Sequence, residues 1–292
     1  MTYLLGFHVR REIVGDITLN VATAGSGPPL LLLHGHPQTM IVWRKIVPDL
    51  IKDYSVVLMD LRGYGDSDAP PSDPDQSTYS KRTMAQDAAR LMTQLGHGRF
   101  SVIGHDRGGR VAHRLARDHA ERVDKICVLD IAPTAAMYAQ TSAAFARRYF
   151  WWFFLIQPAP FPETMIGRDP EYFLRRHIAG QVGTPGAVSE DVITEYLRCY
   201  RKPETIRAIC EDYRAAASID LEHDAEDDAK ISAPLLALWG AKGVVGELFD
   251  VLACWRAKAE NVQGHALDCG HAIQEERPAE VLDALTKFLR SG

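Results

Sequence analysis

The sequence predicts an α/β fold with a mostly parallel central sheet and a helical insertion. Short apolar runs alternate with segments of helical period in the first half of the chain and again near its end, which is typical of βαβ units. Between these two parts the strand-like runs stop. The chain has 292 residues, 46% of them apolar, which is enough for one large domain or two small ones and excludes a disordered or fibrous protein.

The expected elements follow from the apolar period. Strands are expected at 30–33, 56–59, 100–103 and 126–129, with a helix at 84–95. After the insertion, strands are expected at 234–239 and 262–268, and an amphipathic helix at 279–289 closes the chain.

The insertion is expected to be helical. Aromatic and charged residues mix there at helical spacing, and proline or glycine breaks fall at 157–162, at 180–186 and at Pro203. We therefore predict a core domain and a helical cap domain inserted after the sixth strand. The core comprises 1–134 and 221–292, and the cap comprises 135–220.

Charge and cysteine content narrow the class of partner. The 33 basic and 38 acidic residues are mixed along the chain and give a net charge of −5, so a small molecule is expected as partner rather than nucleic acid. No apolar run is long enough to suggest a membrane span. The five cysteines are odd in number and widely spaced, which favours reduced thiols in a cytoplasmic protein over a disulfide framework: Cys127, Cys199, Cys210, Cys254 and Cys269.

The segment 101–110 has the form of a nucleophile elbow. An apolar strand runs into glycines around one acid and then into a helix, and Gly104 and Gly108 stand two residues before and after Asp106. Such a turn projects one side chain above the sheet edge and leaves no room for a Cβ on either side. Asp106 is the predicted nucleophile, and the alternative is an ordinary helix N-cap.

A second loop, 33–38, is expected beside the elbow. Its backbone can supply one N–H, so the amides of His36 and Arg107 would form an oxyanion hole. The alternative is that His34 and His36 bind a metal as a pair, but no further Asp and His follow in a ligand pattern. His34 is therefore expected to be structural.

The chain order then requires an acid and a histidine after the nucleophile. His271 lies just past the last strand and is the predicted base. The segment after the strand at 234–239 contains no carboxylate, so Asp130, at the tip of the preceding strand, is the predicted partner of His271. Glu247 and Asp250 are the alternatives.

An aspartate nucleophile indicates a particular chemistry. A carboxylate is ionised at neutral pH and can displace a leaving group from a saturated carbon without a base. The resulting ester of Asp106 has a carbonyl carbon that water, activated by His271, can attack. The pattern therefore predicts substitution followed by hydrolysis, as at a carbon–halogen bond or an epoxide. It requires no metal or organic cofactor.

Arg107 and Arg110 favour the first of these substrates. Spaced i and i+3 at the start of the helix after the nucleophile, they share one face and can hold a carboxylate through paired N–H donors. They would also keep Asp106 ionised. The alternative for either arginine is a salt bridge within the fold.

These residues resemble the α/β-hydrolase haloacetate dehalogenases, which include the fluoroacetate dehalogenases. The resemblance spans nearly the whole chain and is carried by seven segments: 34–39, 60–65, 104–110, 128–131, 157–160, 210–214 and 270–271. It implies an α/β-hydrolase fold, a homodimer, and the roles given above for Asp106, His271, Asp130, Arg107 and Arg110.

The halide pocket that the resemblance implies is only partly present. The family's His, Trp and Tyr fall on Trp151, Trp152 and Ser218, so only Trp152 matches. Fluoride needs several strong donors to depart, so chloroacetate and bromoacetate are expected to react much faster than fluoroacetate. The Trp151 indole can donate in place of the imidazole, although the run 150–154 also fits an apolar cap core.

Two other functions stay open on the sequence. An epoxide hydrolase shares the aspartate elbow and resembles enzymes that protonate the epoxide with two cap tyrosines. Five tyrosines are available for that role: Tyr138, Tyr149, Tyr172, Tyr196 and Tyr200. The other alternative is a non-catalytic ligand-binding protein on the same scaffold.

Overall fold

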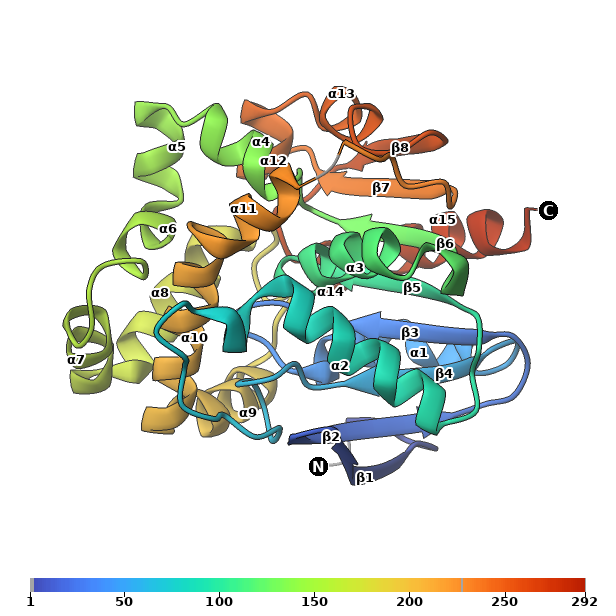
Figure 1. The fold of residues 1–292 in the computed structure, drawn as a ribbon, viewed down its shortest axis with the longest axis horizontal. Coiled ribbons are helices and arrows are strands. Elements are labelled where there is room, and N and C mark those ends of the chain that lie inside the picture. The colour runs from blue at the N-terminus through green and yellow to red at the C-terminus, as the bar shows by residue number, and fades with distance from the viewer. Residues whose placement is uncertain (1–2, 227, 292) are drawn as a thin grey trace.

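A central sheet of eight strands organises the computed structural model, which describes residues 3–226 and 228–291 (Figure 1). The strand order is β1-β2-β4-β3-β5-β6-β7-β8, and every neighbouring pair from β4 to β8 is parallel, whereas β1–β2 and β2–β4 are antiparallel. The strands are β1 His8–Val14, β2 Ile17–Ala24, β3 Pro29–Leu33, β4 Ser55–Met59, β5 Phe100–His105, β6 Val123–Leu129, β7 Leu235–Gly240 and β8 Val262–Leu267. The mostly parallel sheet predicted from the apolar runs is confirmed.

The hairpin of β1 and β2 is the part of the sheet that the apolar runs did not predict. β1 carries charged residues because it is an edge strand and much of it is exposed, and β2 carries Thr18, Asn20 and Thr23 among its apolar residues. Gly15 has a φ of 64° at the turn, a conformation that glycine adopts without a steric penalty.

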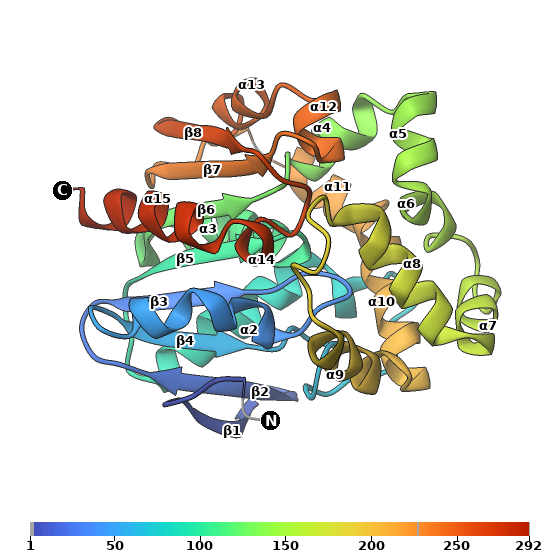
Figure 2. The same cartoon turned by 180° about the vertical axis from the view of Figure 1, so that it is seen from behind.

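Helices cover both faces of the sheet. The helices α2 (Lys81–Gln94) and α3 (Arg107–Asp118) lie on one face, and α1 (Val47–Leu50) and α15 (Pro278–Arg290) lie on the other (Figures 1 and 2). The remaining short helices are η1 Met40–Lys45, η2 Ser77–Tyr79, η3 Ala120–Arg122, α12 Val244–Leu248, α13 Val251–Arg256 and α14 Ile273–Glu276.

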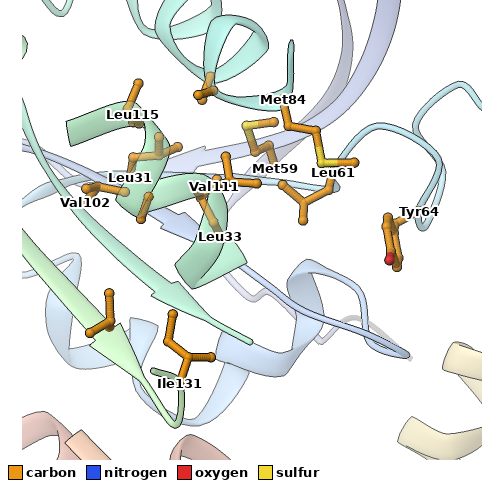
Figure 3. Close-up of a cluster of buried hydrophobic side chains, with 14 of the residues drawn as sticks. Leu31, Leu33, Met59, Leu61, Tyr64, Met84, Val102, Val111, Leu115 and Ile131 are labelled. Atoms are coloured by element: carbon orange, nitrogen blue, oxygen red, sulfur yellow. The ribbon is translucent and has the colours of Figure 1, made fainter. Parts of the chain in front are cut away.

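Alternate side chains of each inner strand enter different cores. Leu31 and Leu33 of β3 pack with Val111 of α3 in one buried cluster, shown in Figure 3. Leu30 and Leu32 belong to a second cluster on the opposite face. Successive side chains of a strand point to opposite faces, which explains why these strands read as continuous apolar runs.

The chain between β6 and β7 is helical, as predicted. Helices α4 to α11, which we call the cap helices, lie beyond the carboxyl ends of the parallel strands (Figure 1). Their bounds are α4 Thr134–Ala139, α5 Ala143–Arg148, α6 Phe150–Phe154, α7 Phe161–Arg168, α8 Pro170–Gln181, α9 Glu190–Tyr200, α10 Pro203–Ala216 and α11 Ile219–Ala225. The division into a core domain and a cap domain at 135–220 stays a prediction. In open α/β sheets, ligands bind outside the carboxyl ends of the strands, which is the edge that these helices cover.

Within the described residues, no helix combines the length and the apolar character needed to cross a bilayer. All five cysteines are unpaired thiols, and every one except Cys254 is buried.

Candidate active site

The turn after β5 has the geometry expected of the elbow. Asp106 joins the strand to α3 with a φ of 48° and a ψ of −116°, in the left-handed half of backbone space that non-glycine residues rarely occupy. A Cβ on Gly104 would lie 2.4 Å from the carbonyl oxygen of Gly108, and a Cβ on Gly108 would lie 2.3 Å from that of Leu33. Both glycines are therefore required by close backbone approach.

Sheet register brings the predicted residues together. In the parallel pairing, Leu33 lies opposite Gly104, and His105 lies opposite Leu129. The residues that follow these positions, including Asp106 and Asp130, therefore emerge at the same edge of the sheet, under the cap helices.

The Asp106 carboxylate is buried and held from one side by a backbone amide. It is 5% exposed, and its Oδ1 accepts a hydrogen bond of 2.9 Å from the amide of His36. Burial would raise the pKa of Asp106, but the positive charges of His271 and Arg107 outweigh it and hold the pKa well below its usual value. Asp106 is thus an ionised carboxylate in the ordinary pH range. No hydrogen bond from the amide of Arg107 to Asp106 is found among the described residues, so the second oxyanion donor stays a prediction.

His271 faces both carboxylates with different atoms. Its Nδ1 lies 2.5 Å from Oδ2 of Asp130, and its Nε2 lies 3.9 Å from Oδ2 of Asp106 with no hydrogen-bond partner in the described chain. With Nδ1 donating to Asp130, a neutral His271 directs the lone pair of Nε2 toward Asp106. The gap of 3.9 Å is too long for a hydrogen bond and suits a water molecule that contacts both groups.

The partner of His271 is Asp130 rather than either alternative acid. The second oxygen of Asp130 accepts from the amide of Gly240 at 2.7 Å. Glu247 pairs with Arg148, and the Asp250 carboxylate accepts from the amide of Ala253, so both alternatives are engaged elsewhere.

The net pKa of His271 is raised. Burial alone would lower it, but the hydrogen bond and charge of Asp130, together with the charge of Asp106, outweigh burial. The backbone of His271 is fixed as well: its amide donates to the carbonyl of Gln181, and its carbonyl lies 3.0 Å from Nε2 of His105. His105, which lies directly before the nucleophile, therefore helps to position the base.

Arg107 is largely neutralised by an acid that the sequence did not indicate. Its Nε and Nη2 donate to the carboxylate of Asp212 on α10, each at 2.8 Å, and only Nη1 is left without a partner. Tyr64 and Lys81 also bind Asp212. The salt bridge that the sequence left as an alternative therefore applies to Arg107, which can offer a ligand only the N–H groups of Nη1 instead of an edge of two nitrogens.

Arg110 is different because its charge is not paired. Its Nη1 donates to the carbonyl of Ala132 and the hydroxyl of Thr134, its Nε has no partner, and no ion pair to it is found in residues 3–226 and 228–291. Burial and the charge of Arg107 lower its pKa. The guanidinium lies 4.7 Å from the ring centre of Trp152. A buried, unpaired guanidinium is a strong candidate site for an anion.

The three predicted halide-pocket residues lie in different surroundings. Trp152 is buried beside Arg110, and Trp151 packs 4.7 Å from the ring of Tyr149. The Ser218 hydroxyl instead contacts Oε1 of Gln76 at 2.6 Å and a carbonyl of α10. Its hydrogen bonds thus connect Ser218 to a neighbouring loop and not to the other two residues.

His34 is structural, as expected. Its Nδ1 donates to the carbonyl of Gly35, and its Nε2 accepts from the amide of Leu61. Both ring nitrogens are engaged, which leaves no free lone pair on His34 for the metal alternative.

Several buried polar atoms around Asp106 have no partner among the described residues. Nearly all buried polar groups in proteins form hydrogen bonds, so such a gathering indicates that a polar ligand binds here. The atoms are Nη1 of Arg107, Nε of Arg110, Nε2 of His271, Oη of Tyr149 and both ring nitrogens of His36 and His177.

The wider family is shown by comparison with other proteins. Residues 28–278 match the family model of the alpha/beta hydrolase fold. The chain is an α/β hydrolase. It is 42% identical to a fluoroacetate dehalogenase of Burkholderia sp. over 98% of this chain and 96% of that protein. It is also similar to a soluble epoxide hydrolase of Corynebacterium sp. (strain C12), with 35% identity over 95% of this chain and 96% of the other.

A crystal structure from Salmonella enterica is similar in shape to this α/β hydrolase. The TM-score is 0.98 at 57% identity, covering 99% of this chain and 97% of the other, and that protein is provisionally assigned as an acyltransferase. The resemblance to the dehalogenase family noted from the sequence is supported by the Burkholderia relative. The dehalogenase, the epoxide hydrolase and the Salmonella protein are described with different substrates, so the substrate of this chain has to be inferred from the residues of its site.

Proposed function

We propose that this α/β hydrolase removes the halide from short 2-haloacids such as chloroacetate and bromoacetate, giving a 2-hydroxy acid. The observation that carries the proposal is the unpaired, buried guanidinium of Arg110, one helical turn after Asp106, whose charge contributes to the lowered pKa of the Asp106 carboxylate. A substrate that carries its own carboxylate one carbon from the leaving group would place that anion on Arg110 and its reacting carbon at Asp106.

The reaction proposed has two steps. An oxygen of Asp106 attacks the carbon, the carbon–halogen bond breaks, and the electron pair leaves with the halide. Nε2 of His271 then takes a proton from water, and the oxygen of that water adds to the ester carbonyl of Asp106. Collapse of the tetrahedral anion, which the amide of His36 is placed to stabilise, expels the hydroxy acid, and the proton returns from His271 to its alkoxide.

The proposed preference is for chloride and bromide over fluoride. Trp151 stands where the family resemblance expects an imidazole, and the Ser218 hydroxyl is bound to Gln76. Fluoride departure depends most on strong donors, so the loss of two of them is expected to slow it most. A release assay with fluoro-, chloro- and bromoacetate checks this, and equal or faster fluoride release contradicts it.

The decisive test of the chemistry is covalent trapping. In a His271→Asn variant the first step should proceed and the second should stop, so a carboxymethyl group should accumulate on Asp106 and appear by peptide mass spectrometry. In the wild type, turnover in heavy-oxygen water should label the Asp106 carboxyl group. Absence of both the adduct and the label would refute the proposed reaction with haloacids.

An epoxide hydrolase is the second candidate, and Tyr149 is the observation that favours it. Its hydroxyl is buried without a partner in the described chain, and its pKa is raised by burial and by the charges of Asp130 and Asp106. It is thus a neutral donor near the nucleophile. Diol formation from a neutral epoxide that is unaffected by Arg110→Met would favour this candidate over the haloacid.

The remaining expectations concern assembly and location. The family resemblance suggests a homodimer, and the five widely spaced cysteines, an odd number, favour a cytoplasmic location. Analytical ultracentrifugation of the purified protein checks the dimer, and a monomer at all accessible concentrations contradicts it.

A further inference from the structure

His177, on the cap helix α8, is a buried histidine whose ring has no hydrogen bond among the described residues. The residue is 4% exposed, and both Nδ1 and Nε2 lack a partner. Its ring centre lies 4.4 Å from that of Trp151 and 4.6 Å from that of His36, both in edge-to-face contact. Nothing in the sequence pattern singled this residue out.

The isolation of this ring is costly unless a ligand relieves it. Burial of a polar group without a hydrogen bond is unfavourable, and an aromatic residue such as phenylalanine would pack against Trp151 at no such cost. Burial lowers the pKa of His177 well below its ordinary value; the charges of His36 and His271 lower it further, and the charge of Asp106 opposes them without reversing the shift. The ring is therefore neutral and has one N–H donor and one acceptor nitrogen.

The position of His177 suits the leaving group. In a displacement at carbon, the leaving group departs on the side opposite the nucleophile. Asp106 lies at the edge of the sheet, whereas His177 belongs to the cap helices that cover that edge. His36 contacts both residues: its amide donates to Asp106, and its ring is in edge-to-face contact with His177.

We propose that the N–H of His177 binds the departing halide, in place of the imidazole that the family resemblance expects at the position of Trp151. The inference rests on the proposed function and adds a specificity-determining residue to it. The carbon–halogen electron pair leaves with the halide, which accepts the hydrogen bond, and the imidazole keeps its proton. Trp151, packed against the ring, holds it in place.

The kinetic test uses the His271→Asn background, in which each protein molecule releases a single halide. His177→Phe keeps the aromatic packing and removes both nitrogens, and His177→Gln keeps an N–H donor. The Phe variant should slow the halide burst at least about tenfold, with a larger effect on fluoroacetate than on bromoacetate, and Gln should restore part of the rate. His265→Gln, which changes an exposed histidine of β8, is the matched control.

A binding test separates this inference from the proposed function. With acetate present to occupy Arg110, bromide is titrated against the tryptophan fluorescence of the otherwise wild-type protein. Quenching that is lost in His177→Phe and retained in His265→Gln supports a halide site at His177, even if no haloacid is turned over. Bromide quenching that survives in His177→Phe, the absence of bromide binding in the wild type, or an unchanged fluoride-to-bromide rate ratio in a folded His177→Phe variant overturns it.

Discussion

Replacement of Arg110 by methionine should separate ligand binding from folding. The Nη1 of Arg110 donates to the carbonyl of Ala132 and the hydroxyl of Thr134. Its Nε has no partner among the described residues, and its Nη2 contacts the sulfur of Met137 at 3.3 Å. The Nε and Nη2 edge of the guanidinium thus donates to no oxygen, and a substrate carboxylate that replaced the weak sulfur contact could bind it in a bidentate way.

The expected loss follows from that edge. Hydrogen bonds to charged groups contribute about 1.5–3 kcal/mol each, so two of them amount to about 3–6 kcal/mol, or a fall of about 10² to 10⁴ in kcat/KM for chloroacetate. The carboxylate binds in both the ground state and the transition state, so most of the fall should be a rise in KM. Arg110→Lys keeps the positive charge but loses the paired N–H donors of the guanidinium, so its kcat/KM for chloroacetate should lie between those of the wild type and Arg110→Met.

The free energy of unfolding should change little in Arg110→Met, in contrast to kcat/KM. Arg110 has no ion pair among the described residues, so its removal relieves an uncompensated buried charge, which offsets the hydrogen bonds lost at Ala132 and Thr134. We expect the free energy of unfolding to change by less than about 1 kcal/mol. Arg107→Met breaks the buried pair with Asp212 and should lower it by about 3–5 kcal/mol.

Steady-state halide release and urea unfolding of these variants provide the measurements. An unchanged KM for chloroacetate in Arg110→Met would show that this guanidinium does not hold the substrate. A loss of stability equal to that of Arg107→Met would show that Arg110 is part of the fold, which would refute the reasoning from its unpaired charge.

Three further predictions concern the nucleophile and the base. As the pH falls from about 8 to about 5, the halide burst should keep its rate, because the lowered pKa of Asp106 keeps its carboxylate ionised. Steady-state turnover should fall over the same range, because protonated His271 cannot take a proton from water. Stopped-flow and steady-state assays measure the two rates, and a parallel fall of both contradicts the roles assigned to Asp106 and His271. Asp130→Asn should lower hydrolysis by about 10³ to 10⁴ through the wrong imidazole tautomer and leave the burst intact, so a lost burst argues against this role. A Cβ on Gly35 would lie 2.4 Å from that of Asp106, so Gly35→Ala should slow the burst about a hundredfold, whereas Gly98→Ala, which meets no atom within 4 Å, should leave it unchanged.

The elbow could be predicted from the sequence because its determinants are local. A Cβ at Gly104 or Gly108 would clash with backbone only a few residues away or on the adjoining strand, and this leaves a readable glycine spacing. Asp130 and His271 could also be predicted, because each follows a strand, β6 or β8, and the parallel strands place their carboxyl ends at one edge of the sheet.

The surroundings of the arginine pair could not be predicted in the same way. Arg107 and Asp212 are separated by 105 positions, and their pairing depends on how α10 packs over the sheet edge. No spacing in the sequence distinguishes Arg107, which is neutralised, from Arg110, which is not. The burial of His177 likewise arises only when α8 packs over the loop that carries His36.

The charges of the site suit two successive steps with opposite requirements. The first step needs an anionic Asp106 next to an anionic substrate, a repulsion that the unpaired Arg110 offsets. In this state the charge of Asp106 contributes to the raised pKa of His271. If Asp106 is alkylated as proposed, that charge disappears and the pKa of His271 falls toward the value set by Asp130 and burial. The base therefore becomes more readily neutral once the ester that it must help to hydrolyse has formed.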